Sequence, residues 1–288
     1  MILKKISKNT LHGVFFLLVS TFLLVGCATD HETKTPRGEV IREWFLEFPW
    51  GRVEAYAVRP PDRGHSPQER YPAILLLHGA DARAQRFRRA MLAHVHDGFI
   101  MMSISLPGFG ASTGPEDFAG PKSVEAAMGA VHYLGTRESV RKDGIFVYGV
   151  GQGASTAALA AARSTNISGL ILEDGFYDLE KTYALLSQKR KNRMRALLGG
   201  TPAQREKTYR ERSPIRVADK IKAPVLLLHS QGGSYPLSGA EAFLKAIEGK
   251  DGTAELQRIK NQGPFESFTH PNIAKRGIPF IRKILETR

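Results

Sequence analysis

The sequence contains very little cysteine and no recognisable metal-binding pattern. Cys27 is the only cysteine in 288 residues, so no disulfide can form within the chain. No pair of His, Cys or Glu residues has a spacing typical of metal ligands. The sequence therefore predicts no disulfide-stabilised fold and no metal site, and we expect no cofactor.

The sequence also lacks an apolar run typical of a membrane-spanning helix. The segment from Val14 to Val25 is apolar except for two residues, and it is shorter than the roughly 20 residues that a spanning helix needs. Three lysines precede it, namely Lys4, Lys5 and Lys8. A short apolar run after a positively charged start is typical of a secretory signal peptide.

The end of this segment resembles the lipobox of bacterial lipoproteins. The residues are Leu24-Val25-Gly26-Cys27. The resemblance implies that residues 1–26 are removed and that Cys27 carries the lipid that attaches the protein to the bacterial cell envelope. Ala28 follows where an aspartate would resemble an inner-membrane retention signal, which favours the outer membrane. The alternative is a structural thiol beside an ordinary signal peptide.

The charge of the chain is strongly positive. Removing residues 1–26 takes away three lysines and no acidic residue, which lowers the net charge from +13 to +10. Basic residues gather in two groups: Lys189, Arg190, Lys191, Arg193 and Arg195, and Arg86, Arg88 and Arg89. No recognition-helix, zinc or aromatic-platform pattern accompanies them. We therefore expect solvated faces or contact with an anionic membrane surface, and no nucleic-acid partner.

Apolar strands alternate with helices from residue 41 onward, which predicts an α/β fold with a mostly parallel sheet covered on both faces. We expect a polar tether at 27–40, one domain at 41–288, and a basic helical lid at about 179–212. Eight strands are expected, at Ile41 to Phe48, Arg52 to Val58, Ala73 to Leu77, Phe99 to Ile104, Ile145 to Tyr148, Leu170 to Leu172, Val225 to Leu228 and Ala254 to Ile259.

Four local patterns in this order resemble the α/β-hydrolase superfamily, especially its dienelactone hydrolase and prolyl oligopeptidase branches. They are Leu77-His78-Gly79-Ala80, Leu106-Pro107-Gly108-Phe109-Gly110 through Gly114, Tyr148-Gly149-Val150-Gly151-Gln152-Gly153, and Arg212-Ser213-Pro214-Ile215 followed by Ile221 to His229. The resemblance covers about residue 41 to the C-terminus. It implies an eight-stranded hydrolase fold with a lid after the sixth strand, and oxyanion-hole-like backbone N–H groups at Ala80 and Gln152.

The glycine-rich turn after the fifth expected strand has two readings. Gly149-x-Gly151-x-x-Ala154, with Glu173 and Asp174 about 20 residues on, matches a dinucleotide-binding fingerprint. The same turn matches G-x-S-x-G with glycine in place of the serine. A dinucleotide fingerprint normally follows the first strand of its domain, so the position favours a hydrolase elbow.

All three positions of the Ser-His-Asp machinery have changed under the hydrolase resemblance. Gly151 replaces the nucleophile. The acid position falls on Gly233, or on Gly232 when counted back from Pro236, and the histidine position falls on Pro264 or Glu266. In serine hydrolases, loss of the nucleophile alone lowers turnover about a millionfold.

Several other residues are candidates for relocated catalytic groups. Ser155 lies one helical turn beyond the elbow, where a packing role is the simpler interpretation. Asp174 and Asp178 follow the sixth expected strand, and Asp178 also fits a helix N-cap. His270 precedes a proline, in a setting typical of a structural or exposed histidine. His78 and His229 belong to strand-end turns in active relatives as well, so they restore nothing.

The sequence therefore predicts a lipid-anchored hydrolase-fold protein that has lost catalysis. It would act by binding a small acyl or anionic ligand, or an envelope protein, in the old cleft. The first alternative is an active esterase or peptidase with relocated catalytic groups. The second is a dinucleotide-binding protein.

Overall fold

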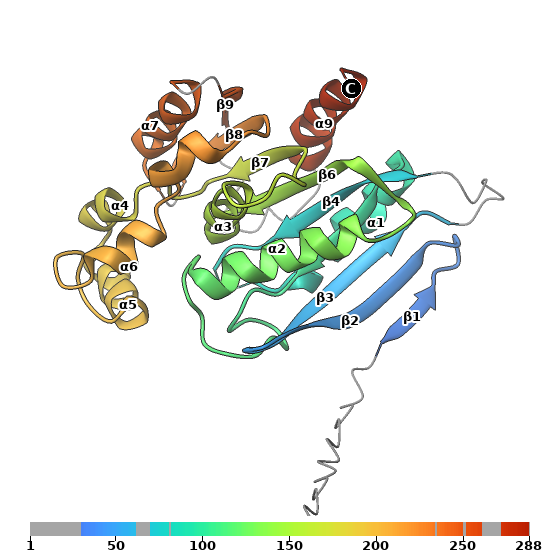
Figure 1. Ribbon diagram of the computed structural model, residues 1–288, viewed down its shortest axis with the longest axis horizontal. Helices are drawn as coiled ribbons and strands as arrows, with labels where there is room; N and C mark the ends of the chain where they lie inside the picture. The colour runs from blue at the N-terminus through green and yellow to red at the C-terminus, as the bar shows by residue number, and fades with distance from the viewer. Residues whose placement is uncertain are drawn as a thin grey trace, which may run out of the picture.

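The structure is a computed structural model that describes residues 30–61, 70–80, 82–233, 235–249, 252–260 and 272–287. This part of the chain forms one nine-stranded sheet with helices on both faces (Figure 1). The strands are β1 (His31–Lys34), β2 (Val40–Phe48), β3 (Gly51–Arg59), β4 (Tyr71–Leu77), β5 (Ile100–Ile104), β6 (Val140–Val150), β7 (Gly169–Glu173), β8 (Val225–Ser230) and β9 (Ala254–Ile259).

The sheet is antiparallel at one end and parallel over the rest. Its strand order is β1-β2-β3-β5-β4-β6-β7-β8-β9. The pairs β1·β2, β2·β3 and β3·β5 are antiparallel. Every pair from β5·β4 to β8·β9 is parallel. The expected α/β fold with a mostly parallel sheet is confirmed.

The expected count of eight strands is wrong, because β1 lies inside the segment predicted as a tether. All four of its residues are exposed, so the strand has no apolar alternation that would reveal it. Its position comes from backbone pairing with β2, in the register His31 with Glu43 through Lys34 with Val40.

Two apolar cores lie on opposite faces of the sheet, and Figure 1 shows the helices that cover these faces. The first contains residues of α2 (Pro121–Gly135), α3 (Gln152–Ala161) and α7 (Leu237–Glu248). The second contains residues of η1 (Ala84–Phe87), α1 (Arg88–His94), η2 (Val95–Asp97), the π-helical turn η4 (Ile273–Gly277) and α9 (Ile278–Glu286). Side chains therefore alternate between two buried faces along the central strands, as a doubly covered sheet requires.

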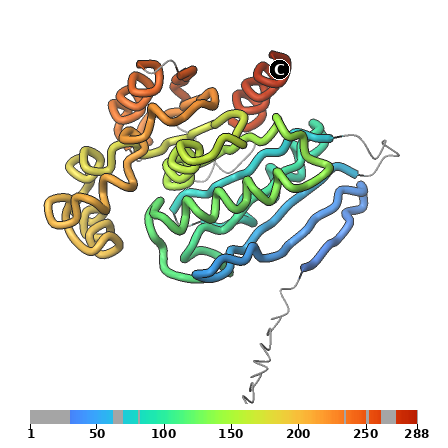
Figure 2. Tube along the Cα trace, viewed as in Figure 1, coloured from blue at the N-terminus to red at the C-terminus, as the bar shows by residue number. Residues whose placement is uncertain are grey.

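The expected lid is a group of three helices. They are α4 (Leu179–Leu185), α5 (Gln188–Leu198) and α6 (Glu206–Glu211), and η3 (Pro214–Lys220) leads from them into β8. Figure 2 shows this group projecting beyond the end of the sheet where β7 ends. None of the helices that the structure describes has the length and apolar character to cross a membrane.

Candidate active-site elbow

A sharp turn between β6 and α3 forms the centre of the candidate site. Its tip is Gly151, with φ 55° and ψ −117°, and the Gly151 N–H donates to the carbonyl of Glu173 at 2.8 Å. A strand that turns directly into a helix with a positive φ at its tip is the geometry that presents a nucleophile in α/β-hydrolases. Here the tip carries no side chain.

The three glycines of this turn meet different surroundings. A Cβ on Gly149 would lie 2.4 Å from the carbonyl oxygen of Gly153, and a Cβ on Gly153 would lie 2.2 Å from that of Leu77. Both positions therefore need glycine for close packing of helix α3 on the strands. A Cβ on Gly151 would meet nothing closer than the Cα of Gly79 at 3.7 Å. The tip thus has room for a side chain, although its positive φ disfavours one.

The residues expected to form an oxyanion hole lie in adjacent turns. Gly79 follows β4, and a Cβ on it would lie 3.2 Å from the carbonyl oxygen of Val150, so the turn that leads to Ala80 contacts the elbow directly. Gln152 is the first residue of α3, and an N–H at that position has no acceptor within its own helix. The arrangement is compatible with two N–H donors beside the tip.

His78 connects two of the loops around the elbow. Its Nδ1 donates to the Gly79 carbonyl at 2.7 Å and its Nε2 accepts from the Leu106 N–H at 2.9 Å, which requires the neutral ring. Burial lowers the pKa of His78 to about 4. The side chain is fully buried, so it holds the loops in place and is not available to a substrate.

Asp174 fills the space beside the expected acid position. A Cβ on Gly233 would lie 3.1 Å from Asp174 Oδ1. That oxygen accepts from the Ser230 N–H at 2.7 Å and lies 3.8 Å from His229 Nδ1. Asp174 has a φ of 48°, an uncommon conformation for a residue with a side chain. A carboxylate is therefore present at this edge of the sheet, but it comes from the end of β7.

The expected histidine positions lie outside the described residues. Pro264, Glu266 and His270 all fall in the segment 261–271. His229 is in β8, largely buried, with Asp174 as its acidic neighbour. The structure therefore brings Asp174 and His229 together.

The other sequence candidates have structural partners. Ser155 is fully buried, and its hydroxyl donates to the Phe176 carbonyl at 2.6 Å and accepts from the Phe176 N–H at 3.1 Å. Asp178 caps α4 by accepting from the Lys181 N–H at 3.1 Å. Glu173 is fully buried, where it accepts from the hydroxyl of Tyr148 and from Asn272. These contacts occupy the Glu173 carboxylate inside the core.

A connection between the lid and the elbow was not visible in the sequence. Arg193 of α5 donates to Glu116 at 3.0 Å. The Gln152 amide, oriented to satisfy its neighbours, donates to the other Glu116 oxygen at 3.0 Å and accepts from the Ala119 N–H at 3.3 Å. Glu116 therefore bridges the lid and the first residue of α3. The ion pair joins residues 77 positions apart, so no local pattern could have revealed it.

Aromatic side chains and unusual backbone conformations surround the same edge. Phe118 stacks on Phe176 with ring centroids 5.1 Å apart, and Tyr235 meets Phe176 edge-on at 5.5 Å. Burial raises the pKa of Tyr235 to about 12, against the opposing charges of two lid arginines. Phe118 and Ala119 have φ values of 52° and 55°, and with Asp174 they are the described non-glycine residues with positive φ.

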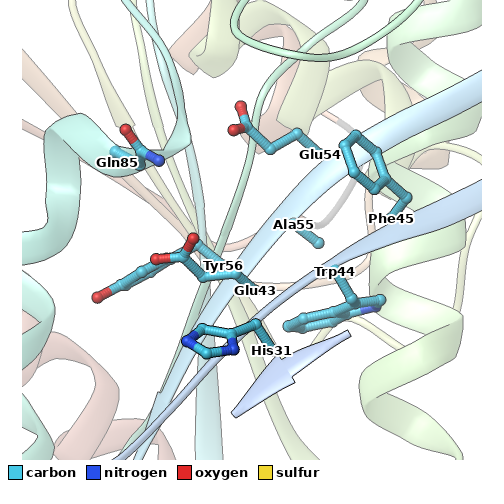
Figure 3. Close-up of a pocket in the computed structure, with 8 residues that line it drawn as sticks. All are labelled: His31, Glu43, Trp44, Phe45, Glu54, Ala55, Tyr56 and Gln85. Carbon is cyan, nitrogen blue, oxygen red and sulfur yellow. The ribbon is translucent and has the colours of Figure 1, made fainter. Parts of the chain in front are cut away.

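A separate cavity of about 170 Å³ lies on the antiparallel end of the sheet, between β1, β2, β3 and η1 (Figure 3). Its lining residues are His31, Glu43, Trp44, Phe45, Glu54, Ala55, Tyr56 and Gln85. Glu54 has a structural role there, because it accepts from the Ser105 hydroxyl at 2.6 Å and from the Ala111 N–H at 3.2 Å. Across the described ranges, His, Cys, Asp and Glu form no group of three suited to a metal ion.

Solved structures with the same fold define the class of protein. An acetyl xylan esterase from Paenibacillus sp. R4 superposes with a TM-score of 0.70 at 19% identity, covering 88% of this chain and 87% of its own. Acetyl xylan esterase 1 from Thermoanaerobacterium sp. gives 0.69 at 14% identity, with 89% and 88% covered. An acylaminoacyl peptidase from Pyrococcus horikoshii gives 0.65 at 19% identity, covering 84% of this chain and 39% of that larger protein. The fold is that of the α/β-hydrolases.

Sequence comparison identifies the family within that class. The prolyl oligopeptidase family matches residues 117–264. The chain belongs to this family. It is also 28% identical over 237 residues to YtmA of Bacillus subtilis, described as an uncharacterized peptidase, with 82% of this chain and 88% of the relative covered.

Proposed function

We propose that this protein is a binding protein on a hydrolase scaffold and does not carry out serine-type hydrolysis. The observation that carries the proposal is the elbow tip, where Gly151 keeps the backbone of a nucleophile position without a side chain. A backbone N–H pair beside the tip has no tetrahedral intermediate to stabilise when nothing attacks a carbonyl. The other components of the elbow then serve recognition.

The neighbouring hydroxyl does not replace the missing nucleophile. Ser155 has no solvent exposure, and both its donor and acceptor functions are used by Phe176. A nucleophile must approach its substrate to near van der Waals distance and needs a base within hydrogen-bond reach. Ser155 would have to leave the core of the molecule to meet either requirement.

Retained backbone strain supports a role for this edge in binding. Each non-glycine residue with positive φ costs on the order of 1–3 kcal/mol, and such residues gather at ligand and active sites. Phe118, Ala119 and Asp174 are all of this kind. Phe118 is part of the aromatic group that includes Phe176 and Tyr235. The proposed ligand is a small acyl or anionic molecule, or an envelope protein that presents such a group.

The proposal includes a lipid anchor at Cys27, supported by the lipobox-like sequence. Labelled palmitate fed to expressing bacteria should enter the protein and should be absent from a Cys27→Ser variant. Label that persists in the variant would contradict attachment at this residue.

Covalent labelling tests the loss of hydrolysis. The chain from residue 28 contains all described elements, and we expect it to resist a fluorophosphonate probe and to hydrolyse p-nitrophenyl acetate no faster than its own Gly151→Ala variant.

Thermal unfolding tests the proposed acyl ligand. The Tm of the protein is measured with octanoate and with octanamide, a neutral molecule of the same length. Octanoate should raise Tm more, and no shift with either would contradict an acyl ligand.

An active hydrolase is the second candidate, and the comparisons favour it over a pure binding role. The family takes its name from a peptidase, and the similar solved proteins are esterases and peptidases. The Asp174–His229 pair at the same edge also provides an acid beside an imidazole. This candidate predicts fluorophosphonate labelling at one serine. Mapping that label to any residue near the elbow would overturn the binding proposal.

A further inference from the structure

Helix α5 differs from the rest of the surface in the balance of its charges. Residues 188–198 contain five basic residues and no acidic one: Lys189, Arg190, Lys191, Arg193 and Arg195. Only Met194 and Leu198 of the helix are buried. The helix therefore has a narrow side packed against the rest of the protein and a broad basic side, and a cluster of Lys and Arg residues on a helix attracts anionic lipid headgroups.

The neighbouring lid helix shows how the chain neutralises basic residues elsewhere. On α6, Lys207 lies 3.8 Å from Glu211 and Arg210 lies 3.0 Å from Glu206. On α5, Arg195 donates to the neutral side chain of Asn192 at 2.7 Å. The described contacts of Lys189 include no acidic partner. Arg193 of the same helix pairs with Glu116, whereas the charges of Lys189 and Arg195 face the solvent, where an anionic partner could compensate them.

A protruding apolar side chain lies beside this charge. Leu185, at the end of α4, is 65% exposed, and it is the large hydrophobic residue that the described surface leaves exposed. The turn from Leu185 to Gln188 leads directly into α5. Figures 1 and 2 show α4 and α5 in the lid group at the margin of the molecule, beyond the sheet.

We propose that Leu185 and the exposed basic side of α5 form a docking face for an anionic lipid bilayer. The basic side chains would contact lipid headgroups, and Leu185 would enter the boundary between headgroups and acyl chains. Each basic residue near an anionic bilayer contributes roughly a factor of five in binding. This contact is made by the folded domain itself, independently of a lipid on Cys27 and of whether the elbow is catalytic. It places the lid helices α4 and α5 against the membrane.

Vesicle cosedimentation tests the docking face. The chain from residue 28, which carries neither leader nor lipid, is mixed with phosphatidylcholine vesicles that contain either no phosphatidylglycerol or about a third of it. We expect binding only to the anionic vesicles, decreasing with added salt. The Lys189→Glu/Arg195→Glu variant should bind more than about thirtyfold more weakly, since two favourable charges are lost and two repulsive ones are added. Leu185→Ser should weaken binding several-fold.

A matched control keeps the change in net charge and moves it to the other face of the sheet. Arg83 and Arg89 are exposed residues at η1 and α1, and Arg83→Glu/Arg89→Glu should retain most of the binding. Circular dichroism confirms that each variant is folded. Equal losses in the two charge-reversal variants would show attraction by net charge alone and overturn the proposal. Equal binding to both kinds of vesicle, or none to either, would also overturn it.

Discussion

Glycine at the elbow tip is not imposed by packing. Gly149 and Gly153 are each held by backbone atoms within 2.5 Å of a would-be Cβ, whereas the nearest atom to one on Gly151 is 3.7 Å away. The residue at 151 is therefore free to change within a fold that fixes its neighbours. A side chain there would tolerate the positive φ at a cost on the order of 1–3 kcal/mol.

A thiol placed at the tip reports the chemistry that this position still offers. The chain from residue 28 has no cysteine, so a Gly151→Cys variant carries a single thiol. The N-terminus of α3 should lower the pKa of that thiol. We expect alkylation by iodoacetamide at pH 7 to be about tenfold faster than in a Gly98→Cys variant.

Gly98 is a suitable control for this measurement because its φ is also positive, at 88°, and a Cβ on it would meet nothing within 4 Å. It follows the C-terminal end of η2, whereas Gly151 precedes the N-terminal end of α3. Equal reactivity of the two thiols would show that the elbow exerts no electrostatic activation, and would weaken the view that a nucleophile site has been preserved.

Elements with apolar periodicity were predictable from the sequence, and elements held by pairing alone were not. The expected strands at Ala73 to Leu77 and Val225 to Leu228 correspond to β4 and β8, which are almost wholly buried. Strand β1 was not predicted, because its four residues are polar and exposed. The helix expected at Ala84 to His94 is present, but its first turn is the 3-10 helix η1. The hydrophobic pattern of a sequence indicates which segments are buried, so it cannot reveal a polar edge strand that is exposed.

The lid was predictable as a helical insertion, but its attachment was not. Glu116 holds α5 through Arg193 and holds the start of α3 through Gln152. Glu116, Gln152 and Arg193 lie far apart in sequence, and only the folded chain brings them together. The side chain of Glu116 is 12% exposed and that of Arg193 is 46% exposed, so solvent screens the pair in part.

Removal of the negative charge at Glu116 should loosen the lid. In a Glu116→Gln variant the amide keeps hydrogen-bonding capacity but loses its charge, and a partly exposed pair is worth about 0.5–1 kcal/mol. We expect limited trypsin digestion within α5 to become about threefold faster, because cleavage follows local opening. Glu180→Gln, which removes the pair with Arg216 at 3.3 Å, is the matched control. An unchanged cleavage rate in α5 would argue against a role of Glu116 in holding the lid.

At the scale of the whole molecule, the order of motifs along the chain predicted the fold, while the local sequence did not predict the site. The turns at His78-Gly79 and Gly149 to Gly153 meet at the edge of the sheet as the hydrolase resemblance implied. Asp174 could not be placed beside Gly233 from the sequence, because that contact joins the ends of β7 and β8 across the sheet. Strand order decides which loop ends meet, and only the folded chain specifies the side chains between them.

Global stability should depend on pH through His78, which is fully buried as a neutral ring that accepts from the Leu106 N–H. Its pKa falls from 6.5 to about 4 on folding, mainly through burial. The unfolded chain therefore binds the proton more readily. The contribution of His78 to stability is complete above pH 6.5 and declines as the pH falls toward 4.

Between pH 8 and pH 5 this linkage should remove about 2 kcal/mol of the free energy of unfolding. Urea unfolding of the wild type and of a His78→Gln variant isolates the effect, since glutamine can still accept a hydrogen bond but does not titrate. The variant should be less stable at pH 8, and the difference between the two proteins should shrink as the pH is lowered. Other carboxylates and histidines titrate alike in both proteins and cancel in this difference. If the free energies of unfolding of the two proteins changed in parallel with pH, His78 would either remain neutral in the unfolded chain or not be buried in solution. The proposal that His78 links the loops beside the elbow rigidly would then have to be abandoned.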